Sequence, residues 1–194
     1  MKRSRSRRTV KTQEAPIPAL AKALLSLALC ALLGGCYFMS AQPLFAPERG
    51  ACPFAAEERF ETVQADPEAG PLPDGADRPT LRIATHGAHC LAERSDEPEV
   101  ERLLFVPLRR GAWIVQSETD SALYFIARLR GDRLSFHFPD CDHFSESRLR
   151  RLGVVTEDDA GRSTCLANDA RQIEILFRSW RMRAPVQIYR RIES

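Results

Sequence analysis

Alternation of apolar and polar residues is clearest in the middle of the chain. From 81 to 85, and again from 123 to 130, every second residue is apolar, which is typical of a strand with one buried face. Gly131 and Asp132 then fit a two-residue turn with a positive φ at the glycine. The apolar face resumes at Leu134, Phe136 and Phe138. The spacing predicts a β-hairpin over 123–138.

Shorter stretches predict further strands. They lie at 59–64, around Cys90, at 102–108, at 113–117 and at 186–190. The stretch 102–108 is nearly all apolar, whereas the others alternate or are brief. Together these stretches predict an antiparallel β-meander of six to seven strands that is curved or partly closed.

Two stretches have helical spacing. A short one begins at Ser145, runs to Leu152 and stops at Gly153. A longer one begins after Asn168 or Asp169 and has apolar residues at i, i+3, i+4 and i+7, namely Ile173, Leu176, Phe177 and Trp180. We expect this C-terminal helix to cover the sheet, which makes the predicted fold class α+β.

The start of the chain has a different pattern. A basic segment precedes an apolar run of 15 residues, 19–33, which is shorter than the roughly 20 residues of a membrane-spanning helix. The run ends at Leu33-Gly34-Gly35-Cys36. This motif resembles the lipobox of bacterial lipoproteins. The resemblance implies that residues 1–35 are a signal peptide and that Cys36 carries a lipid that anchors the protein to a membrane.

The resemblance also bears on localisation. Tyr37, and not Asp, follows the cysteine. Under the enterobacterial sorting rule this favours the outer membrane, with the domain facing the periplasm. Arg7 and Arg8 form an incomplete twin-arginine motif, and we expect the general secretory route instead.

Composition and charge narrow the possible partners. Residues 1–35 carry seven basic side chains and one acidic side chain, so the remaining 159 residues have 21 basic and 25 acidic side chains and a net charge of −4. This balance does not predict nucleic-acid binding. We expect 36–58, rich in Pro, Ala and Gly, to be the lipidated cysteine and a flexible tether, and 59–194 to be a single globular domain.

Four cysteines remain after the lipidated one. In an oxidising compartment they predict two disulfides, for which three pairings are possible. A bridge from Cys141 to Cys165 would close the segment that holds the short helix and an acidic loop, and would stabilise the domain by about 3–4 kcal/mol. Cys52 and Cys90 then pair by elimination. We predict 52–90 and 141–165.

All four histidines lie near cysteines: His86, His89, His137 and His143. Imidazole suits zinc or copper, and the histidines would converge if Cys90 bonded Cys141. Cysteines in disulfides are not ligands, however, and the spacing is not a zinc signature. We predict no metal site and no cofactor, and keep a periplasmic metal-binding protein as the alternative function.

Catalytic motifs are missing from the sequence. It contains no GxSxG, HExxH, P-loop or GxGxxG motif, and the acidic runs 93–101 and 157–159 are expected to be solvated loops. We predict that the protein is not an enzyme. The mature chain also resembles a group of small bacterial lipoproteins at 105–108, 138–141 and 165–167, and this resemblance implies no activity.

The predicted function is therefore that of a non-catalytic, membrane-anchored envelope lipoprotein. Its domain would be a binding or structural module for an envelope protein or a small envelope ligand. A further alternative is inhibition of a cell-wall hydrolase.

Overall fold

The computed structural model describes residues 37–54, 56–64, 72–73, 76–118, 121–159, 162–182 and 186–192. The lipobox motif and Arg7-Arg8 lie outside these ranges. The compact unit that contains the described residues spans Gly35–Ser194. Within the described ranges, no helix has the length and apolar character needed to cross a bilayer.

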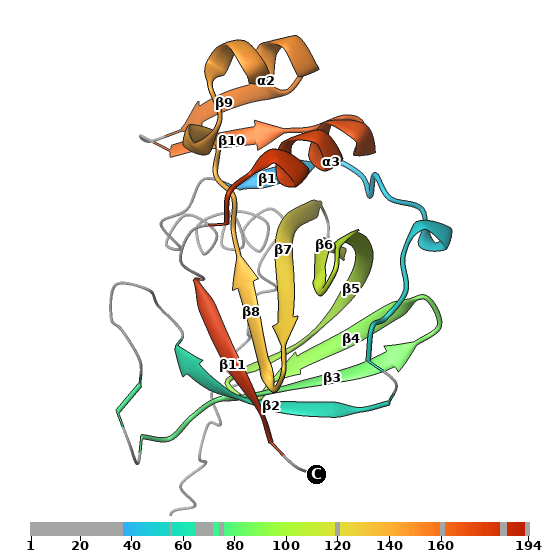
Figure 1. Cartoon of the computed structure of the whole chain (residues 1–194), viewed down its shortest axis with the longest axis vertical. Coiled ribbons are helices and arrows are strands. Elements are labelled where there is room, and N and C mark those ends of the chain that lie inside the picture. Colours follow the sequence, from blue (N-terminus) through green and yellow to red (C-terminus); the bar gives the residue numbers. More distant parts are fainter. Residues whose placement is uncertain are drawn as a thin grey trace, which may run out of the picture. The chain divides into compact units, whose positions relative to one another are not determined.

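Eight strands close into a barrel (Figure 1). They are β2 (Glu58–Gln64), β3 (Thr80–His86), β4 (His89–Arg94), β5 (Glu97–Arg109), β6 (Ala112–Glu118), β7 (Ala122–Arg130), β8 (Arg133–His137) and β11 (Gln187–Ile192). Consecutive strands from β2 to β8 pair in antiparallel fashion, and β11 pairs with both β8 and β2.

The β-dominated α+β class is confirmed, but the predicted meander of six to seven partly closed strands is wrong. The last strand, β11, closes the ring because it enters between the two ends of the meander. The predicted hairpin is confirmed as β7 and β8, joined at Gly131 with a φ of 60°.

Aromatic and aliphatic side chains fill the barrel interior. Phe125 stacks on Phe138 with ring centroids 4.9 Å apart and meets Phe136 edge-on at 5.4 Å. Phe54, which precedes β2, enters the same core. An eight-stranded barrel is just wide enough for side chains to fill. The interior is therefore a packed core.

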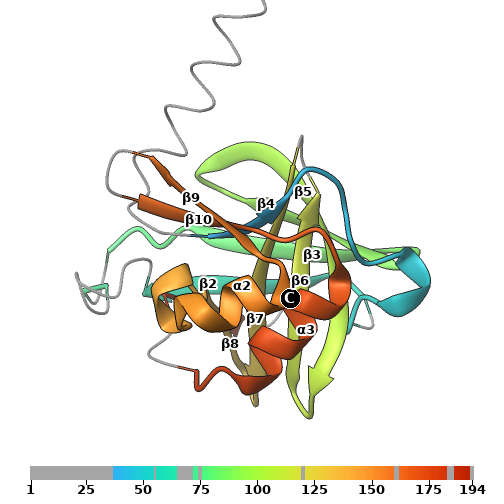
Figure 2. The ribbon, with the colours of Figure 1, turned by 90° about the horizontal axis from the view of Figure 1, so that it is seen from above.

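A second core lies between the barrel wall and a cap, which Figures 1 and 2 show gathered beside the end of the barrel. The cap consists of β1 (Phe38–Ser40), the 3-10 helix η2 (Cys141–His143), α2 (Glu146–Leu152), β9 (Val155–Asp159), β10 (Arg162–Leu166) and α3 (Ala170–Ser179). Its buried side chains, among them Leu176 and Phe177, pack with Leu104, Ile114 and Ile126 of the wall. The C-terminal helix covers the sheet through its predicted apolar stripe.

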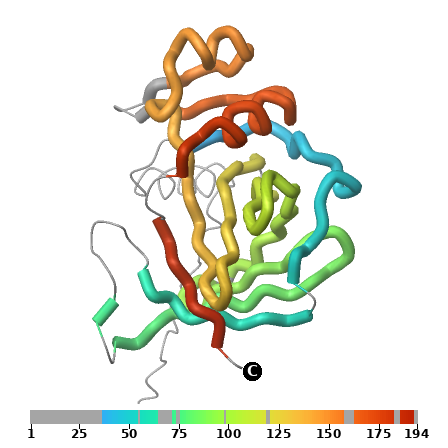
Figure 3. Tube along the Cα trace, viewed as in Figure 1, coloured from blue at the N-terminus to red at the C-terminus, as the bar shows by residue number. Residues whose placement is uncertain are grey.

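The segment 37–54 runs from the cap along the side of the barrel to β2, through the 3-10 helix η1 (Pro47–Arg49) (Figure 3). The flexible tether expected over 36–58 is corrected for its described part, 37–54, which packs against the domain. Phe38, Phe45 and Phe54 are 0%, 1% and 2% exposed, so each anchors the segment in one of the two cores. We name residues 37–54 the strap.

Buried hydrogen bonds fasten the strap to the barrel wall. The Gln116 side-chain oxygen accepts from the backbone N–H groups of Leu44 and Phe45, both at 2.9 Å. Its amide nitrogen donates to the Phe45 carbonyl at 3.1 Å. The Tyr124 hydroxyl accepts from the Leu44 N–H at 3.0 Å and lies 2.7 Å from Ser40 Oγ. Burial raises the pKa of the Tyr124 phenol.

Both acidic runs lie largely in strands, which corrects the loops expected there. The run 157–159 ends β9, which pairs with β10, and 93–101 forms the turn and the flanking strands of the β4–β5 hairpin. Cross-strand pairing explains the difference. Arg82 on β3 lies directly opposite Glu93, and such opposite-charge pairs are favourable on a sheet surface.

Candidate functional site

The four histidines lie in two separate places. His86 and His89 are opposite each other at the β3–β4 turn. His137 and His143 both pack against Trp180, with ring centroids 6.3 Å and 5.4 Å away. Among the described residues, no group of three or more His, Cys, Asp or Glu side chains is placed to hold a metal ion. The arrangement gives the metal-binding alternative no support.

His89 belongs to a partly buried polar cluster that continues from Gln116. Its Nδ1 lies 3.1 Å from Arg102 Nη2, and its Nε2 lies 3.4 Å from Glu118 Oε1. A guanidinium only donates, so Nδ1 accepts and the ring proton of neutral His89 is on Nε2, facing the carboxylate. Glu118 Oε1 also accepts from Gln116 Nε2 at 3.0 Å. The cluster therefore supports the wall beneath the strap.

Two cysteine pairs lie at bonding distance. Cys52 and Cys90 have sulfur atoms 2.08 Å apart, and Cys141 and Cys165 have them 2.31 Å apart. The structure thus brings together both pairs named from the sequence and supports disulfide bonds in the domain. One pair ties the strap to β4, and the other ties η2 to β10. Both pairs therefore join structural elements of the domain.

The candidate binding site is a small hollow of about 270 Å³ in the cap. Its lining comes from η2, from α2 and from the end of α3, and consists of His143, Phe144, Arg148, Ser179, Trp180 and Arg181. We name it the Trp180 hollow. No carboxylate lines it, so its charge is positive.

Local contacts fix the polar groups of the Trp180 hollow. Arg148 Nη2 donates to Ser179 Oγ at 2.6 Å, and its guanidinium lies 6.0 Å from the centre of the Phe144 ring. His143 Nδ1 accepts the Asp140 N–H at 3.0 Å, which leaves Nε2–H of the neutral ring as a donor. In the part of the chain that the structure describes, neither Arg148 nor Arg181 has an ion-pair partner.

This geometry suits binding better than catalysis. Ser179 Oγ donates its proton to the Leu176 carbonyl at 2.7 Å and accepts from Arg148, so neither of these contacts is with a general base. A serine nucleophile needs such a base. Two guanidinium groups and an imidazole N–H instead offer donors to a carboxylate or a similar anion.

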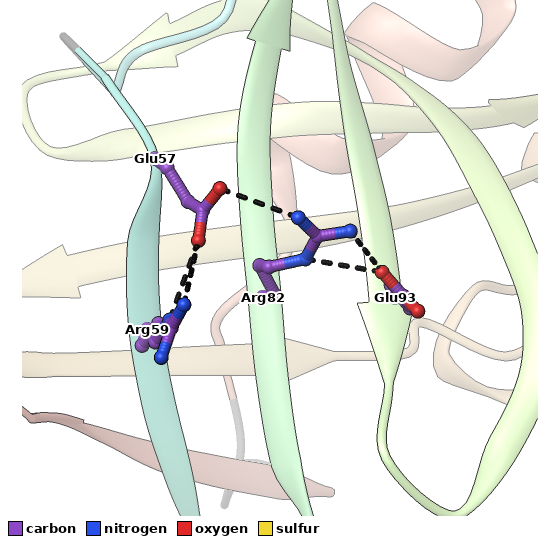
Figure 4. A network of polar contacts seen from close by, with 4 residues as sticks. All are labelled: Glu57, Arg59, Arg82 and Glu93. Atoms are coloured by element: carbon purple, nitrogen blue, oxygen red, sulfur yellow. Dashed lines mark hydrogen bonds and ion pairs between the residues drawn. The ribbon is translucent and has the colours of Figure 1, made fainter. Parts of the chain in front are cut away.

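A second hollow, of about 340 Å³, lies on β2–β4 and β11 and is lined by Arg59, Thr80, Leu81, Arg82, Glu93, Ser95 and Ile192. Its charges are matched, as Figure 4 shows. Arg82 donates to Glu93 and to Glu57, and Glu57 also accepts from Arg59. The hydrogen bond with Glu93 raises the pKa of Arg82. This hollow has little charge left for a ligand.

Sequence reasoning placed Trp180 in the core, and its 6% exposure agrees, but it missed the hollow beside it. The only visible signal was an arginine, Arg181, directly after the apolar stripe of the last helix. Leu33, Gly34, Gly35 and Cys36 lie outside the described residues, so the anchor stays a prediction. In the comparisons with known proteins, no family model, no curated protein and no solved structure matches the chain.

Proposed function

We propose that this protein is a lipid-anchored lipoprotein of the bacterial envelope whose domain is a non-catalytic binding module for an anionic group. The observation that carries the binding role is the Trp180 hollow, where Arg148 and Arg181 face a concave surface without an acidic partner among the described residues. The lipobox motif at 33–36 carries the anchoring role.

The hydrogen-bond donors that line the Trp180 hollow indicate the class of ligand. Guanidinium groups bind planar carboxylates through paired hydrogen bonds, and the apolar edges of Phe144 and Trp180 allow a short hydrocarbon or ring beside that carboxylate. The small volume of about 270 Å³ limits the bound part to one carboxylate with a few carbon atoms. A terminal carboxylate or an acidic side chain of an envelope partner fits this description.

The anchor also bears on how the domain is presented. Tyr37 is already part of the fold, because its carbonyl accepts the N–H of Cys165 at 2.9 Å. Consecutive Cα atoms are about 3.8 Å apart, so a lipid on Cys36 would join the domain without an intervening spacer. The acyl chains, at about 0.8 kcal/mol per buried CH₂, would hold the domain on the bilayer.

Lipidation is tested by changing the cysteine. We expect Cys36→Ala to abolish incorporation of a labelled fatty-acid analogue and to leave an uncleaved precursor, because the thiol is the acylated group. Cys30→Ala, which removes the neighbouring cysteine of the apolar run, is the matched control and should be labelled like the wild type. Equal labelling of the wild type and the Cys36→Ala variant would refute the anchor.

Binding in the Trp180 hollow is tested with small carboxylates. Titration of the purified full-length chain with succinate and with benzoate should change tryptophan fluorescence in a saturable way, because Trp180 borders the site. Arg148→Gln and Arg181→Gln should each weaken the response about tenfold, which corresponds to about 1.4 kcal/mol. Arg171→Gln, on the exposed side of α3, should leave it unchanged. An equal effect of all three changes would refute the site.

A further inference from the structure

Two turns of the barrel bring five arginines together. The β5–β6 turn contains Arg109 and Arg110, and the β7–β8 hairpin contains Arg128, Arg130 and Arg133. The turns touch, because the Leu129 N–H donates to the Gly111 carbonyl at 3.1 Å. We name these five residues the arginine surface.

The register places most of these side chains on the outer wall. Leu134 points into the barrel core, so its neighbour Arg133 and the residue opposite Arg133, which is Arg130, face outward. Likewise Ala127 belongs to the barrel core, so its neighbour Arg128 faces outward. Ala112 lies opposite both Arg128 and Arg109, and residues opposite each other share a face of the sheet. Four of the five side chains are exposed, and Arg128 is half-buried.

The charge of the arginine surface is not matched. Among the described residues none of the five arginines forms an ion pair, and the turns that carry them contain one acidic residue, Asp132. On the next strand Arg190 lies directly opposite Arg133, and its own charge is already paired with Glu61. The unmatched positive charge therefore lies on β7, on β8 and on the β5–β6 turn, and the paired Arg190 on β11 borders it.

Such an arrangement is unfavourable for the isolated domain. Like charges directly opposite each other on a sheet destabilise it, and Arg130 faces Arg133 in this way. On β2–β4 of the same barrel, by contrast, Arg59 and Arg82 form ion pairs with glutamates, namely Glu57 and Glu93. The contrast indicates that the missing acidic groups come from another molecule.

The shape and composition of the arginine surface restrict that molecule. The surface lies on strands and tight turns, and neither the Trp180 hollow nor the hollow on β2–β4 includes any of its residues. Large exposed apolar side chains lie elsewhere, at Val100, Val155 and Ile175. Folded protein partners are usually held by buried aromatic or aliphatic anchors, whereas a flexible polyanion is held by charge alone.

We infer that the arginine surface binds an extended polymer that carries closely spaced carboxylates, outside the membrane to which the chain is anchored. Adjacent strands are about 4.8 Å apart and alternate residues about 6.8 Å apart, so the guanidinium groups present a grid for successive carboxylates. The binding mode is additive and salt-dependent, and it needs no induced change in the barrel.

The position outside the membrane rests on the proposed anchor, whereas the polymer binding does not. Phe38 lies opposite Tyr124, so the register places Tyr37 next to Phe125, five residues before Arg130 along β7. At about 3.3 Å per residue, this separation is about 17 Å, roughly two Debye lengths at physiological ionic strength. Headgroup charges at the anchor are therefore largely screened from the far end of the arginine surface.

The test uses the full-length chain in neutral detergent micelles and poly-L-glutamate as the probe. We expect saturable binding at low salt that weakens steeply as salt is added. The triple variant Arg128→Gln/Arg130→Gln/Arg133→Gln should bind about tenfold more weakly, which corresponds to about 1.4 kcal/mol. The matched control, Arg151→Gln/Arg171→Gln/Arg178→Gln, removes the same charge from exposed positions on α2 and α3 and should bind like the wild type.

Several outcomes would overturn the inference. An equal loss in both triple variants would show that only net charge matters, and binding of phosphatidylglycerol vesicles as tightly as of poly-L-glutamate would make the surface a membrane contact. A thermal unfolding curve of each variant shows whether it is folded. The intact mass of the same wild-type sample reports whether Cys36 is lipidated, so failure of polymer binding and failure of the anchor are distinguished.

Discussion

Two regions of the barrel wall carry arginine on neighbouring strands, but they balance its charge differently. On β2–β4, Arg59 and Arg82 alternate with Glu57 and Glu93, and every one of these charges has a partner (Figure 4). On the arginine surface, Arg130 faces Arg133 and no carboxylate is paired with either in the described part of the chain.

Residue type and exposure alone therefore do not identify a binding surface. Exposed ion pairs contribute little to stability, so the paired region is explained as an ordinary solvated sheet face. An unpaired, like-charged region has no such explanation within the domain. Its charge is available for a partner.

The largest effect should come from the disulfide whose loop contains most of the paired region. Cys52 and Cys90 are 38 residues apart, and β2 and β3 lie between them. Cys52→Ala/Cys90→Ala should lower the free energy of unfolding by about 3–4 kcal/mol in the chain-entropy model. Denaturant unfolding measures it. If the folded variant still binds poly-L-glutamate, the two regions are independent; loss of binding while folded would show that they are not.

The strand between the two regions provides a pH-dependent test. Tyr189 of β11 lies between β2 and β8, and burial raises the pKa of its phenol to about 12. The unfolded chain loses this proton near pH 10 and the folded domain only near pH 12, so stability is fully present below pH 10 and falls as the pH rises through this window. The fall attributable to Tyr189 is about 2 kcal/mol at pH 12.

Tyr189→Phe should flatten this alkaline decline, as measured by unfolding at pH 8, 10 and 11.5. Arginines keep their charge throughout this range, so neither charged region should contribute to the change. A decline that is as steep in Tyr189→Phe as in the wild type would show that other groups, such as the buried Tyr124 phenol, dominate.

The smallest effect is expected in the paired region. Arg82→Gln removes contacts with both Glu57 and Glu93, which are solvent-screened. We expect a slight loss of stability at low salt that disappears in 1 M salt, because screening already removes most of the interaction there. Binding of poly-L-glutamate should not weaken. A clear loss of polymer binding would place Arg82 in the same functional surface as the arginine surface.

Local patterns predicted the elements whose two faces differ. Alternation identified β3 and the β7–β8 hairpin, because each has one face in the packed interior. The spacing of Ile173, Leu176 and Phe177 identified α3. The strand β5 is apolar on both faces because Leu103 and Phe105 face the interior while Leu104 and Val106 face the cap. Its continuous apolar run marked it as buried without showing that a cap existed.

Long-range pairing accounts for what the sequence did not show. Closure of the barrel depends on the pairing of β11 with β2. In this pairing Arg190 of β11 lies opposite Glu61 of β2, and the two residues are 129 positions apart in the sequence. The strand β1 has only three residues, which are too few to show an alternation of apolar and polar positions. The strap was therefore interpreted as a flexible tether. The arginine surface was visible as arginines beside Gly111 and Gly131. Only the contact between those two turns makes it one surface.

In our proposal, the domain tolerates unmatched charge at the arginine surface because a carboxylate polymer supplies the missing partners. The most direct test is the free energy of unfolding of the wild type and of Arg130→Gln/Arg133→Gln at low salt, each with and without poly-L-glutamate. Without the polymer, the variant should be more stable by a few tenths to about 1 kcal/mol, because a like-charged cross-strand pair is removed. With the polymer, the wild type should gain more stability than the variant, because binding to the folded state stabilises it. A variant that is less stable without the polymer, together with equal gains for both proteins when it is added, would contradict the claim.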